Sequence, residues 1–299
     1  MRTRTELVQA LARRWPRLCE AIVGRSIQGR LPARIHQHWL GRAAAAVLFA
    51  DGARVYGSPF LFRVPLALLP TYRAYEPLAV EAFRSRLRRD QVVIDVGAHA
   101  GYYTVAAGRA VGPGGVVHAF EPCPLTLDLL ARNVAANRLH NVRIHPCAAG
   151  ATPGRRVLHV TASSMTNAFV ESPYEATSGT VVVDERPVDA VVAGSAQLVK
   201  VDVEGAELDA LAGMRGLLGR SDQAELFVEW SPPNQRAAGR DPHELLDRLR
   251  DEGFPSLTLL DDLRGRRLSV DQALAEERAG TLPPLWYCTL WARRQGATT

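Results

Sequence analysis

The sequence predicts an open α/β sheet, mostly parallel, that ends in an antiparallel hairpin and is preceded by a mainly helical N-terminal appendage. Two observations lead to this fold class. From Gln91 onward, short runs of β-branched residues alternate with segments of helical period, which is typical of repeated β-α units around a parallel sheet. The final apolar run, at 284–292, follows short connections that favour a terminal hairpin over another crossover, so we expect it to run antiparallel.

The length and composition of the chain limit the number of domains. It has 299 residues, of which 47% are hydrophobic. This is enough for one substantial core and an appendage, and too little for several domains of ordinary size. We therefore divide the chain into residues 1–80, a helical and hairpin appendage that acts as a lid or an oligomer contact, and residues 81–299, the main domain.

The first half of the main domain is predicted from its turn residues. The GPGG segment at 112–115 ends one helix, and Pro124 is tolerated in the first turn of the next. The expected strands are 91–96, 116–121 and 142–147, and the expected helices are 102–111 and 124–137.

The β-α pattern weakens between Ala148 and Gly194 and then resumes. The weak stretch contains two short β runs that flank a loop at 161–180, rich in serine and threonine, which we expect to face a substrate. After it, the expected strands are 198–203, 225–230, 256–260 and 284–292, and the expected helices are 206–218 and 243–253.

The N-terminal appendage carries apolar residues at helical spacing. They are Leu7, Leu11, Trp15, Leu18 and Ile22. We interpret this segment as a helix, interrupted near a proline, that packs on the main domain or on the partner in a homodimer, in preference to a helix on a membrane surface. Residues 54–64 predict a short hairpin that we expect to act as a lid.

The composition excludes several classes of protein. The four cysteines are scattered without CxxC spacing, which argues against a disulfide framework or a zinc site. The longest apolar run, at 43–50, is far shorter than the roughly 20 residues of a membrane span. The N-terminus lacks the apolar core of a secretion signal, so we expect a cytoplasmic protein. The net charge of +5 comes from arginines dispersed among acidic residues, so no nucleic-acid partner is predicted.

The segment IDVGAHAGYYT has the form of a nucleotide-binding turn between a strand and a helix. It places Asp95 at the strand end, Gly97 in the turn and Gly101 at the start of the helix, as in Rossmann-like folds. His99 stands where the dinucleotide fingerprint has its second glycine, and a side chain there obstructs a diphosphate. The turn therefore favours S-adenosylmethionine, which offers the helix N-terminus a carboxylate but has no phosphate. NAD and a purely structural turn are the alternatives.

Glu121 ends the second strand twenty residues after Gly101. An acidic side chain at this position can accept hydrogen bonds from both ribose hydroxyls. The alternative is an exposed glutamate before a proline turn. We prefer the ligand role, in which the side chain binds the ribose and not the protein core. The adenine is then expected near the end of the third strand, around Cys147 and Ala148.

A second cluster of ionisable residues surrounds the end of the predicted strand at 198–203. Period-two alternation puts Lys200 and Asp202 on one face. A lysine in a central parallel strand is costly to bury unless a carboxylate pairs with it, and Asp202 and Glu229 are the candidate partners. Ligands of open α/β sheets bind at the carboxyl ends of strands. The predicted catalytic residues are Asp202, Lys200, Glu229 and Glu204.

Within this cluster, Asp202 is expected to accept the proton of a hydroxyl group and also to contact the cofactor. For Glu207 we prefer the role of a favourable acid in the first turn of a helix. The carboxylates of Asp202, Glu204 and Glu229 could also hold a divalent cation. No histidine spacing supports a transition metal, and we predict no metal site.

Taken in order, these motifs resemble the FkbM-like family of S-adenosylmethionine-dependent methyltransferases. The resemblance runs from about Tyr75 to Asp261 through YEP at 75–77, VVIDVGAHAGYYT, VHAFEP, VKVDVEGAELDAL and LFVEW. It implies a class I methyltransferase sheet and S-adenosylmethionine as the cofactor. It also implies O-methylation of a hydroxyl group on a small molecule, either a secondary metabolite such as a macrolide or polyketide, or a sugar.

The resemblance also assigns residues. The positions that match cofactor contacts are Asp95, Gly97, Gly101 and Glu121, and the block that holds Asp202, Glu204 and Gly205 matches the region beside the transferred methyl group. The segments before Tyr75 and at 161–180 depart from the family's pattern, so we expect them to set the acceptor.

Two other functions fit parts of the sequence. An NAD-dependent oxidoreductase would share the turn and Glu121. However, the Tyr-x-x-x-Lys pair used by such enzymes is absent, because Ala196 stands four residues before Lys200. A non-catalytic protein of the methyltransferase fold, binding a partner through its N-terminal helices, would not need acidic residues at both the cofactor and acceptor ends of the site.

Overall fold

The computed structural model of the chain describes residues 53–54, 60, 62–64, 75–162 and 164–294. The chain divides into two compact units, Met1–Tyr75 and Glu76–Thr299. The second unit contains every residue of the candidate site described below.

In the first unit, the described residues form a small hairpin. The strand β1 (Ala53–Arg54) pairs antiparallel with β2 (Arg63–Val64), which confirms the predicted hairpin, while its role as a lid stays a prediction. The predicted helix from Leu7 to Ile22 and the predicted homodimer contact lie outside the described residues.

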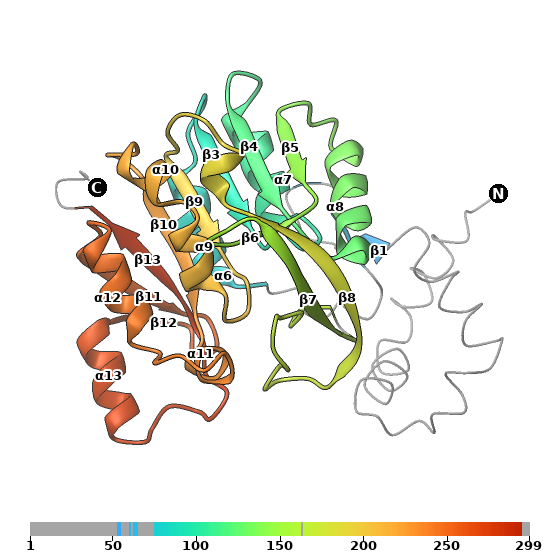
Figure 1. Ribbon diagram of the computed structural model, residues 1–299. Helices are drawn as coiled ribbons and strands as arrows, with labels where there is room; N and C mark the ends of the chain where they lie inside the picture. Colours follow the sequence, from blue (N-terminus) through green and yellow to red (C-terminus); the bar gives the residue numbers. More distant parts are fainter. Residues whose placement is uncertain (1–52, 55–59, 61, 65–74, 163, 295–299) are drawn as a thin grey trace, which may run out of the picture. The chain divides into compact units, whose positions relative to one another are not determined.

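The second unit is built on an eight-stranded sheet with the order β12-β11-β13-β10-β9-β3-β4-β5 (Figure 1). Its strands are β3 (Val92–Val96), β4 (Val116–Phe120), β5 (Val142–His145), β9 (Leu198–Val201), β10 (Glu225–Trp230), β11 (Ser256–Asp261), β12 (Arg266–Ser269) and β13 (Cys288–Arg293). The strands from β10 to β5 are parallel. The mostly parallel sheet that the sequence predicts is thus confirmed.

The predicted antiparallel end of the sheet is also confirmed, but its hairpin does not consist of the strands that we expected. The hairpin is formed by β11 and β12. The last strand, β13, returns between β10 and β11 and is antiparallel to both. It begins at Cys288, four residues later than the apolar run that predicts it, and the prediction of short connections before it is wrong, because a helix at Val270–Arg278 precedes it.

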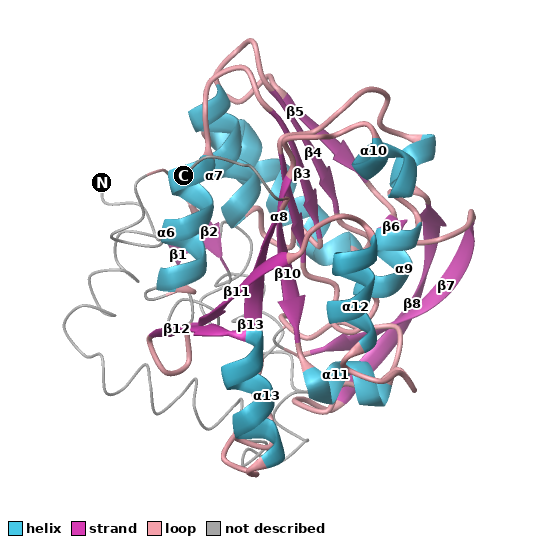
Figure 2. Cartoon of the chain, turned by 90° about the vertical axis from the view of Figure 1, so that its left-hand side faces the viewer, coloured by secondary structure: helices cyan, strands magenta, loops and turns pink. Residues whose placement is uncertain are grey.

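Helices cover both faces of this sheet (Figure 2). One face carries α6 (Pro77–Arg86), α7 (Tyr102–Val111) and α8 (Pro124–Ala136), and the other carries α9 (Glu207–Ala212), α10 (Arg215–Gly219) and α12 (Glu244–Asp251). Two more helices, α11 (Pro232–Ala237) and α13 (Val270–Arg278), follow β10 and β12.

The predicted helix at 206–218 is wrong in one respect, because it consists of the two helices α9 and α10. The chain between them passes close to another segment: a Cβ atom at Gly213 would lie 2.0 Å from the carbonyl oxygen of Gly150. The carboxylate of Asp189 then accepts hydrogen bonds from two backbone N–H groups in the first turn of α10. The second helix therefore has its own cap.

Alternation along the central strands separates an apolar face from one that also carries ionisable residues. The buried residues that join the leucines of α9, α10 and α12 in the main core are Ile94, Val96, Val199, Val201, Leu226 and Val228. Since successive side chains of a strand point to opposite faces, the intervening positions bring Asp95, Lys200 and Phe227 side by side. Two ionisable residues thus lie within the sheet, on the face covered by α6 and α7.

A second, three-stranded sheet contains the weak β runs. Its order is β6-β8-β7, with β6 (Ala148–Ala149), β7 (Gly154–Thr161) and β8 (Thr177–Arg186), and a short 3-10 helix, Val188–Ala190, follows. The loop between β7 and β8 reaches the large sheet, because the hydroxyl of Tyr174 lies 2.6 Å from that of Ser231, directly after β10. The loop that we expect to face a substrate is therefore held at the end of β10.

None of the described helices combines the length and apolar character that crossing a membrane requires. Cys123, Cys147 and Cys288 are buried free thiols, as their spacing indicates, and Cys19 lies outside the described residues.

Candidate active site at the carboxyl ends of the central strands

The candidate site lies where the strand order of the large sheet reverses. The chain runs from β3 outward through β4 and β5, and then returns to place β9 and β10 on the other side of β3. In open α/β sheets, ligands bind outside the carboxyl ends of the strands at such a point. Asp95, Glu121, Asp202 and Glu229 lie at or directly after the ends of β3, β4, β9 and β10. The fold thus brings both predicted clusters to one edge.

The turn after β3 requires glycine at position 97. The backbone of Gly97 has φ +81°, and a Cβ atom there would lie 1.8 Å from the carbonyl oxygen of Asp202. The turns after β3 and β9 are therefore in backbone contact. Gly101, with φ +87°, begins α7, and a Cβ atom there would lie 2.5 Å from a methyl group of Leu130. Both predicted glycines thus serve close packing around the turn.

His99 connects this turn to the loop between β7 and β8. Its backbone has φ 49°, and its Nε2 lies 2.9 Å from the hydroxyl of Ser164. Burial lowers the pKa of His99 to about 4, so the imidazole is neutral at physiological pH. The predicted cofactor turn and the predicted substrate-facing loop therefore share a direct contact.

Glu121 fastens two backbone segments together. Its Oε2 accepts a hydrogen bond from the N–H of His99 at 2.8 Å. Its Oε1 accepts bonds from the N–H of Cys123 and the hydroxyl of Thr126, each at 2.8 Å. We expected this side chain to bind a ligand and not the protein. The second part of that expectation is wrong, because Glu121 bonds to the protein. Oε2 accepts only one bond within the described residues, and a carboxylate oxygen can accept two, so the ribose role stays a prediction.

Asp95 is buried beside Glu121 and Lys200. It accepts a hydrogen bond from the hydroxyl of Thr104, and burial raises its pKa to about 6. The predicted adenine neighbours, Cys147 and Ala148, follow β5 and are both buried. Ala148 starts β6 and pairs with β8, so this turn joins the two sheets. The adenine contact itself stays a prediction.

Lys200 is buried in β9, with 1% of its surface exposed. Its ammonium donates a hydrogen bond to Oδ2 of Asp202 at 2.7 Å, which confirms the expected pairing with a carboxylate. Burial lowers the pKa of Lys200, but the charges of Asp202, Glu76 and Glu229 outweigh it and raise the pKa overall. Lys200 is therefore a charged group within the sheet, and its ammonium is paired with the carboxylate of Asp202.

Two residues that the sequence analysis did not assign complete the surroundings of Lys200. The ammonium lies 4.9 Å from the centre of the Tyr103 ring. The hydroxyl of Tyr103 donates a hydrogen bond to Glu76 at 2.6 Å. Burial raises the pKa of Glu76 to about 6. Glu76 belongs to the YEP segment and Tyr103 to the glycine-turn segment, so both lay in segments already singled out, but no spacing rule indicates that they meet.

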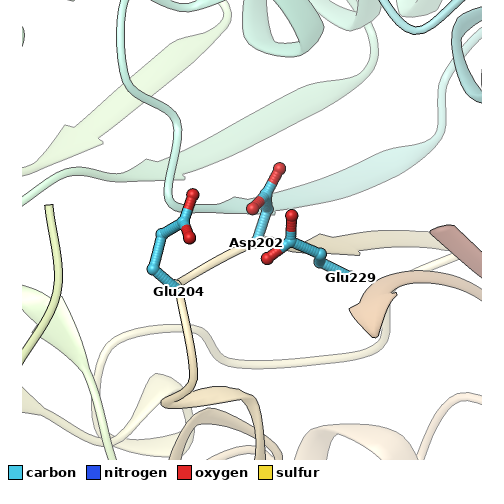
Figure 3. Close-up of side chains that lie close together, drawn as sticks. All are labelled: Asp202, Glu204 and Glu229. Atoms are coloured by element: carbon cyan, nitrogen blue, oxygen red, sulfur yellow. The ribbon is translucent and has the colours of Figure 1, made fainter. Parts of the chain in front are cut away.

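Asp202, Glu204 and Glu229 turn their carboxylates toward one another (Figure 3). One oxygen from each lies within 4.8 Å of the others. Asn234 donates a hydrogen bond to Oε2 of Glu204 at 2.6 Å. Burial, followed by the charge of neighbouring carboxylates, raises the pKa of Glu204 and of Glu229 well above the ordinary range. The four predicted catalytic residues are thus brought together in one cluster.

Glu207 serves the backbone. Its Oε1 accepts hydrogen bonds from the N–H groups of Val203 and Gly205, at 3.2 and 3.1 Å. Its Oε2 accepts a hydrogen bond from the side chain of Gln235. This agrees with the preferred interpretation of Glu207 as an acid at the start of a helix, because these bonds fix the turn between β9 and α9.

Two tyrosines lie next to the acidic cluster. Tyr174, from the loop between β7 and β8, stacks edge to face with Tyr287 at 6.2 Å between ring centres. Burial raises the pKa of both tyrosines, and the carboxylates of Glu229 and Glu204 raise it further. Tyr287 was predicted to be part of the last strand, whereas it lies directly before that strand. The candidate site therefore has two aromatic rings next to its acidic cluster.

Replacing Glu121 by alanine is expected to weaken both the fold and cofactor binding. The variant loses three hydrogen bonds that tie the glycine turn to α8, and bonds to charged groups contribute about 1.5–3 kcal/mol each. Urea unfolding should show a lower midpoint. Calorimetry with S-adenosylhomocysteine should show affinity reduced about tenfold or more. Lower stability with unchanged affinity would leave Glu121 a structural residue only.

Comparison with known proteins gives one family. The family model of the methyltransferase FkbM domain matches residues 95–256, from the end of β3 to the start of β11. A protein named Methyltransferase 1, from Beauveria bassiana (strain ARSEF 2860), is 26% identical over 147 residues, which are 42% of this chain and 59% of that protein. The chain thus spans less than two thirds of the length of this curated relative.

Solved structures of methyltransferases are also similar. The methyltransferase FkbM from Methylobacillus flagellatus KT has a TM-score of 0.42 and 16% identity, over 75% of this chain and 59% of that one. The structure of M. jannaschii TYW2 in complex with AdoMet has a TM-score of 0.46 and 15% identity, over 82% of this chain and 87% of that one.

Proposed function

This chain belongs to the FkbM methyltransferase family, whose model covers more than half of its residues, and we propose that it is an S-adenosylmethionine-dependent O-methyltransferase. The acceptor is a hydroxyl group of a secondary metabolite, such as a macrolide or polyketide, or of a sugar. The observation that carries the proposal is the position of Asp202. Its backbone carbonyl oxygen lies against Gly97 in the predicted cofactor turn. Its carboxylate belongs to the acidic cluster, where we expect the methyl acceptor to bind.

The charged groups at the strand ends fit S-adenosylmethionine better than a cofactor that contains phosphate. Asp95, Glu121 and Asp202 surround the turn with carboxylates, which attract the ammonium and sulfonium charges of this cofactor and repel a diphosphate. Glu121 Oε2 can accept a bond from a ribose hydroxyl. The first turn of α7 offers its backbone N–H groups to the cofactor's carboxylate. We propose Asp95, Gly97, His99, Gly101, Glu121, Cys147, Ala148 and Asp202 as the cofactor-binding residues.

The residues of the acidic cluster prepare the acceptor hydroxyl. When bound, S-adenosylmethionine supplies an electrophilic methyl group on a positively charged sulfur. Asp202 would accept the proton of the acceptor hydroxyl as the hydroxyl oxygen takes up this methyl group, and S-adenosylhomocysteine would be the other product. Lys200 orients Asp202 by donating a hydrogen bond to Oδ2, so the carboxylate is held in place to accept that proton. In-line placement of the hydroxyl is the other requirement of the reaction.

Specificity for the acceptor is assigned to the loop between β7 and β8. Tyr174 comes from this loop and Tyr287 from the segment before β13, and their rings meet beside the cluster. Flat aromatic surfaces next to carboxylates suit a molecule that has apolar carbon skeleton on one side and hydroxyl groups on the other. This supports a polyketide or sugar acceptor.

The first test of this proposal is calorimetry of the full chain with three ligands. We expect binding of S-adenosylmethionine and S-adenosylhomocysteine and none of NAD, because the side chain of His99 stands in the turn and carboxylates surround it. Tight NAD binding with no response to S-adenosylhomocysteine would favour an oxidoreductase instead. Binding of the cofactor without methyl transfer to any acceptor in labelled screens of cell extracts would favour a non-catalytic protein of this fold.

A further inference from the structure

The cluster of Asp202, Glu204 and Glu229 has a geometry that suits a single small ion. Each side chain comes from a different place: Asp202 directly after β9, Glu204 in the following turn and Glu229 near the end of β10. One oxygen of each lies within 4.8 Å of the others, and the carboxylates converge on one space (Figure 3). Hard divalent cations bind carboxylate oxygens at about 2.0–2.6 Å, so oxygens on opposite sides of one ion stand about twice that distance apart.

An independent observation indicates that a ligand is missing from this space. Glu229 is only 8% exposed, and its Oε2 is buried without a hydrogen-bond partner among the described residues. Buried polar atoms are nearly always bonded, and leaving one unsatisfied is costly. The side chain belongs to a strand in the middle of the sheet and points at the two other carboxylates. A bound cation would satisfy this oxygen.

The cluster is held in place by neighbours that leave oxygens available. Lys200 fixes Oδ2 of Asp202 at 2.7 Å, and Asn234 fixes Oε2 of Glu204 at 2.6 Å. Each of these carboxylates keeps its second oxygen, for which the described residues provide no hydrogen bond. Three carboxylates against the single ammonium of Lys200 carry a net charge of minus two when all are ionised. One divalent cation balances that charge.

We propose that Asp202, Glu204 and Glu229 form a binding site for an oxygen-preferring divalent cation such as Mg²⁺ or Mn²⁺. All three ligands are carboxylates, the donor type that these ions select. The sequence alone led us to predict no metal. The structure indicates the opposite, because the three side chains converge and Oε2 of Glu229 has no hydrogen-bond partner among the described residues.

The cation would also narrow the class of acceptor, and this consequence rests on the proposed function. A divalent ion stabilises a developing negative charge on a bound oxygen. An acceptor with two neighbouring oxygens, such as a vicinal diol, can contribute both to one ion. We therefore expect the methylated hydroxyl to have an oxygen substituent on the adjacent carbon.

Electron paramagnetic resonance of Mn²⁺ tests the site directly. The full chain is first treated with EDTA and desalted, and Mn²⁺ is then added without cofactor or acceptor. We expect the signal of free Mn²⁺ to fall until one ion is bound per chain, and Mg²⁺ to release it. Glu229→Gln should weaken Mn²⁺ binding about tenfold or more, because even changes to groups behind the metal ligands cost 10–100-fold.

The matched control is Glu225→Gln, on the same strand. Glu225 is also buried but lies at the opposite end of β10, where it bonds to Arg86 and Trp291, so Mn²⁺ affinity should stay unchanged. Circular dichroism checks each fold, and Glu204→Gln replaces Glu229→Gln if the latter does not fold. An undiminished free Mn²⁺ signal at millimolar ion, or equal binding by wild type and the cluster variants, would overturn the proposal. Either result leaves the calorimetric test of cofactor binding unaffected, so the two proposals fail separately.

Discussion

Replacing Asp202 by asparagine is expected to lower the rate of methyl transfer by about 10²–10⁴-fold, the loss typical of a removed general acid or base. Asparagine has nearly the same shape as aspartate but cannot take up the proton of the acceptor. Affinity for S-adenosylhomocysteine, which lacks the sulfonium charge, should fall far less than the rate, because the backbone carbonyl that meets Gly97 is unchanged. The measurement is single-turnover transfer of a labelled methyl group to an acceptor identified by screening extracts.

The buried lysine complicates this experiment and also supplies its control. Asp202→Asn leaves the ammonium of Lys200 without its carboxylate at 2.7 Å, and breaking a buried ion pair from one side costs about 3–5 kcal/mol. The double variant Lys200→Met with Asp202→Asn removes both charges and should recover most of that stability in urea unfolding. If Asp202 is the base, the double variant is stable and still slow, whereas Lys200→Met alone loses less activity.

Two results would count against this assignment. Recovery of activity together with stability in the double variant would show that the loss came from the fold. Full turnover by Asp202→Asn would place the base elsewhere, with Glu229 and His99 as the next candidates. Glu229 is near the proposed acceptor position, and His99 is neutral and bonded to the loop between β7 and β8.

The strands of the sheet were largely predictable because the relevant signals are local. The runs from Val92 to Val96 and from Glu225 to Trp230 are apolar or β-branched apart from Asp95, Glu225 and Glu229, as expected for strands buried on both faces. The helix at 102–111 is bounded by Gly101 and Gly112, and both lie at positive φ. These strands and this helix are therefore indicated by the residues within them and by the turn residues that bound them.

The elements that were missed depend on short-range capping or on tertiary contacts. α13 begins with a capping box in which Ser269 and Gln272 exchange hydrogen bonds, a signal present in the sequence that the apolar period alone does not reveal. The N-terminus of α6 is held by Asp262, whose carboxylate accepts from the N–H groups of Leu78 and Ala79. No local rule pairs residues so far apart in the chain.

The proximity of the candidate residues to one another was predictable, and the hydrogen bonds between them and the backbone were less so. Strand-end position correctly brought Lys200, Asp202, Glu204 and Glu229 together, since parallel strands end at one edge. The sequence did not indicate that Glu121 bonds to the backbone of His99. This hydrogen bond depends on how the ends of two neighbouring strands are offset along the sheet. Such distances follow from packing and not from residue type.

Replacing Gly97 by alanine is expected to produce the second large effect, on stability and on cofactor binding together. Two costs combine at this position. A non-glycine residue at φ +81° loses roughly 1–2 kcal/mol to backbone strain. The new methyl group would also stand 1.8 Å from the carbonyl oxygen of Asp202, and relieving such overpacking typically costs a further 1–3 kcal/mol or so.

Gly194→Ala separates these two costs. Gly194 has φ +89°, and a Cβ atom there meets nothing within 4 Å, so this variant carries the strain without the collision. Urea unfolding should therefore rank the wild type as most stable, Gly194→Ala next and Gly97→Ala last. Only Gly97→Ala should weaken S-adenosylhomocysteine binding, because only this substitution forces apart the turns after β3 and β9. Equal effects of the two substitutions on stability and affinity would mean that the two turns are not in contact and that Asp202 does not join the glycine turn to the acidic cluster.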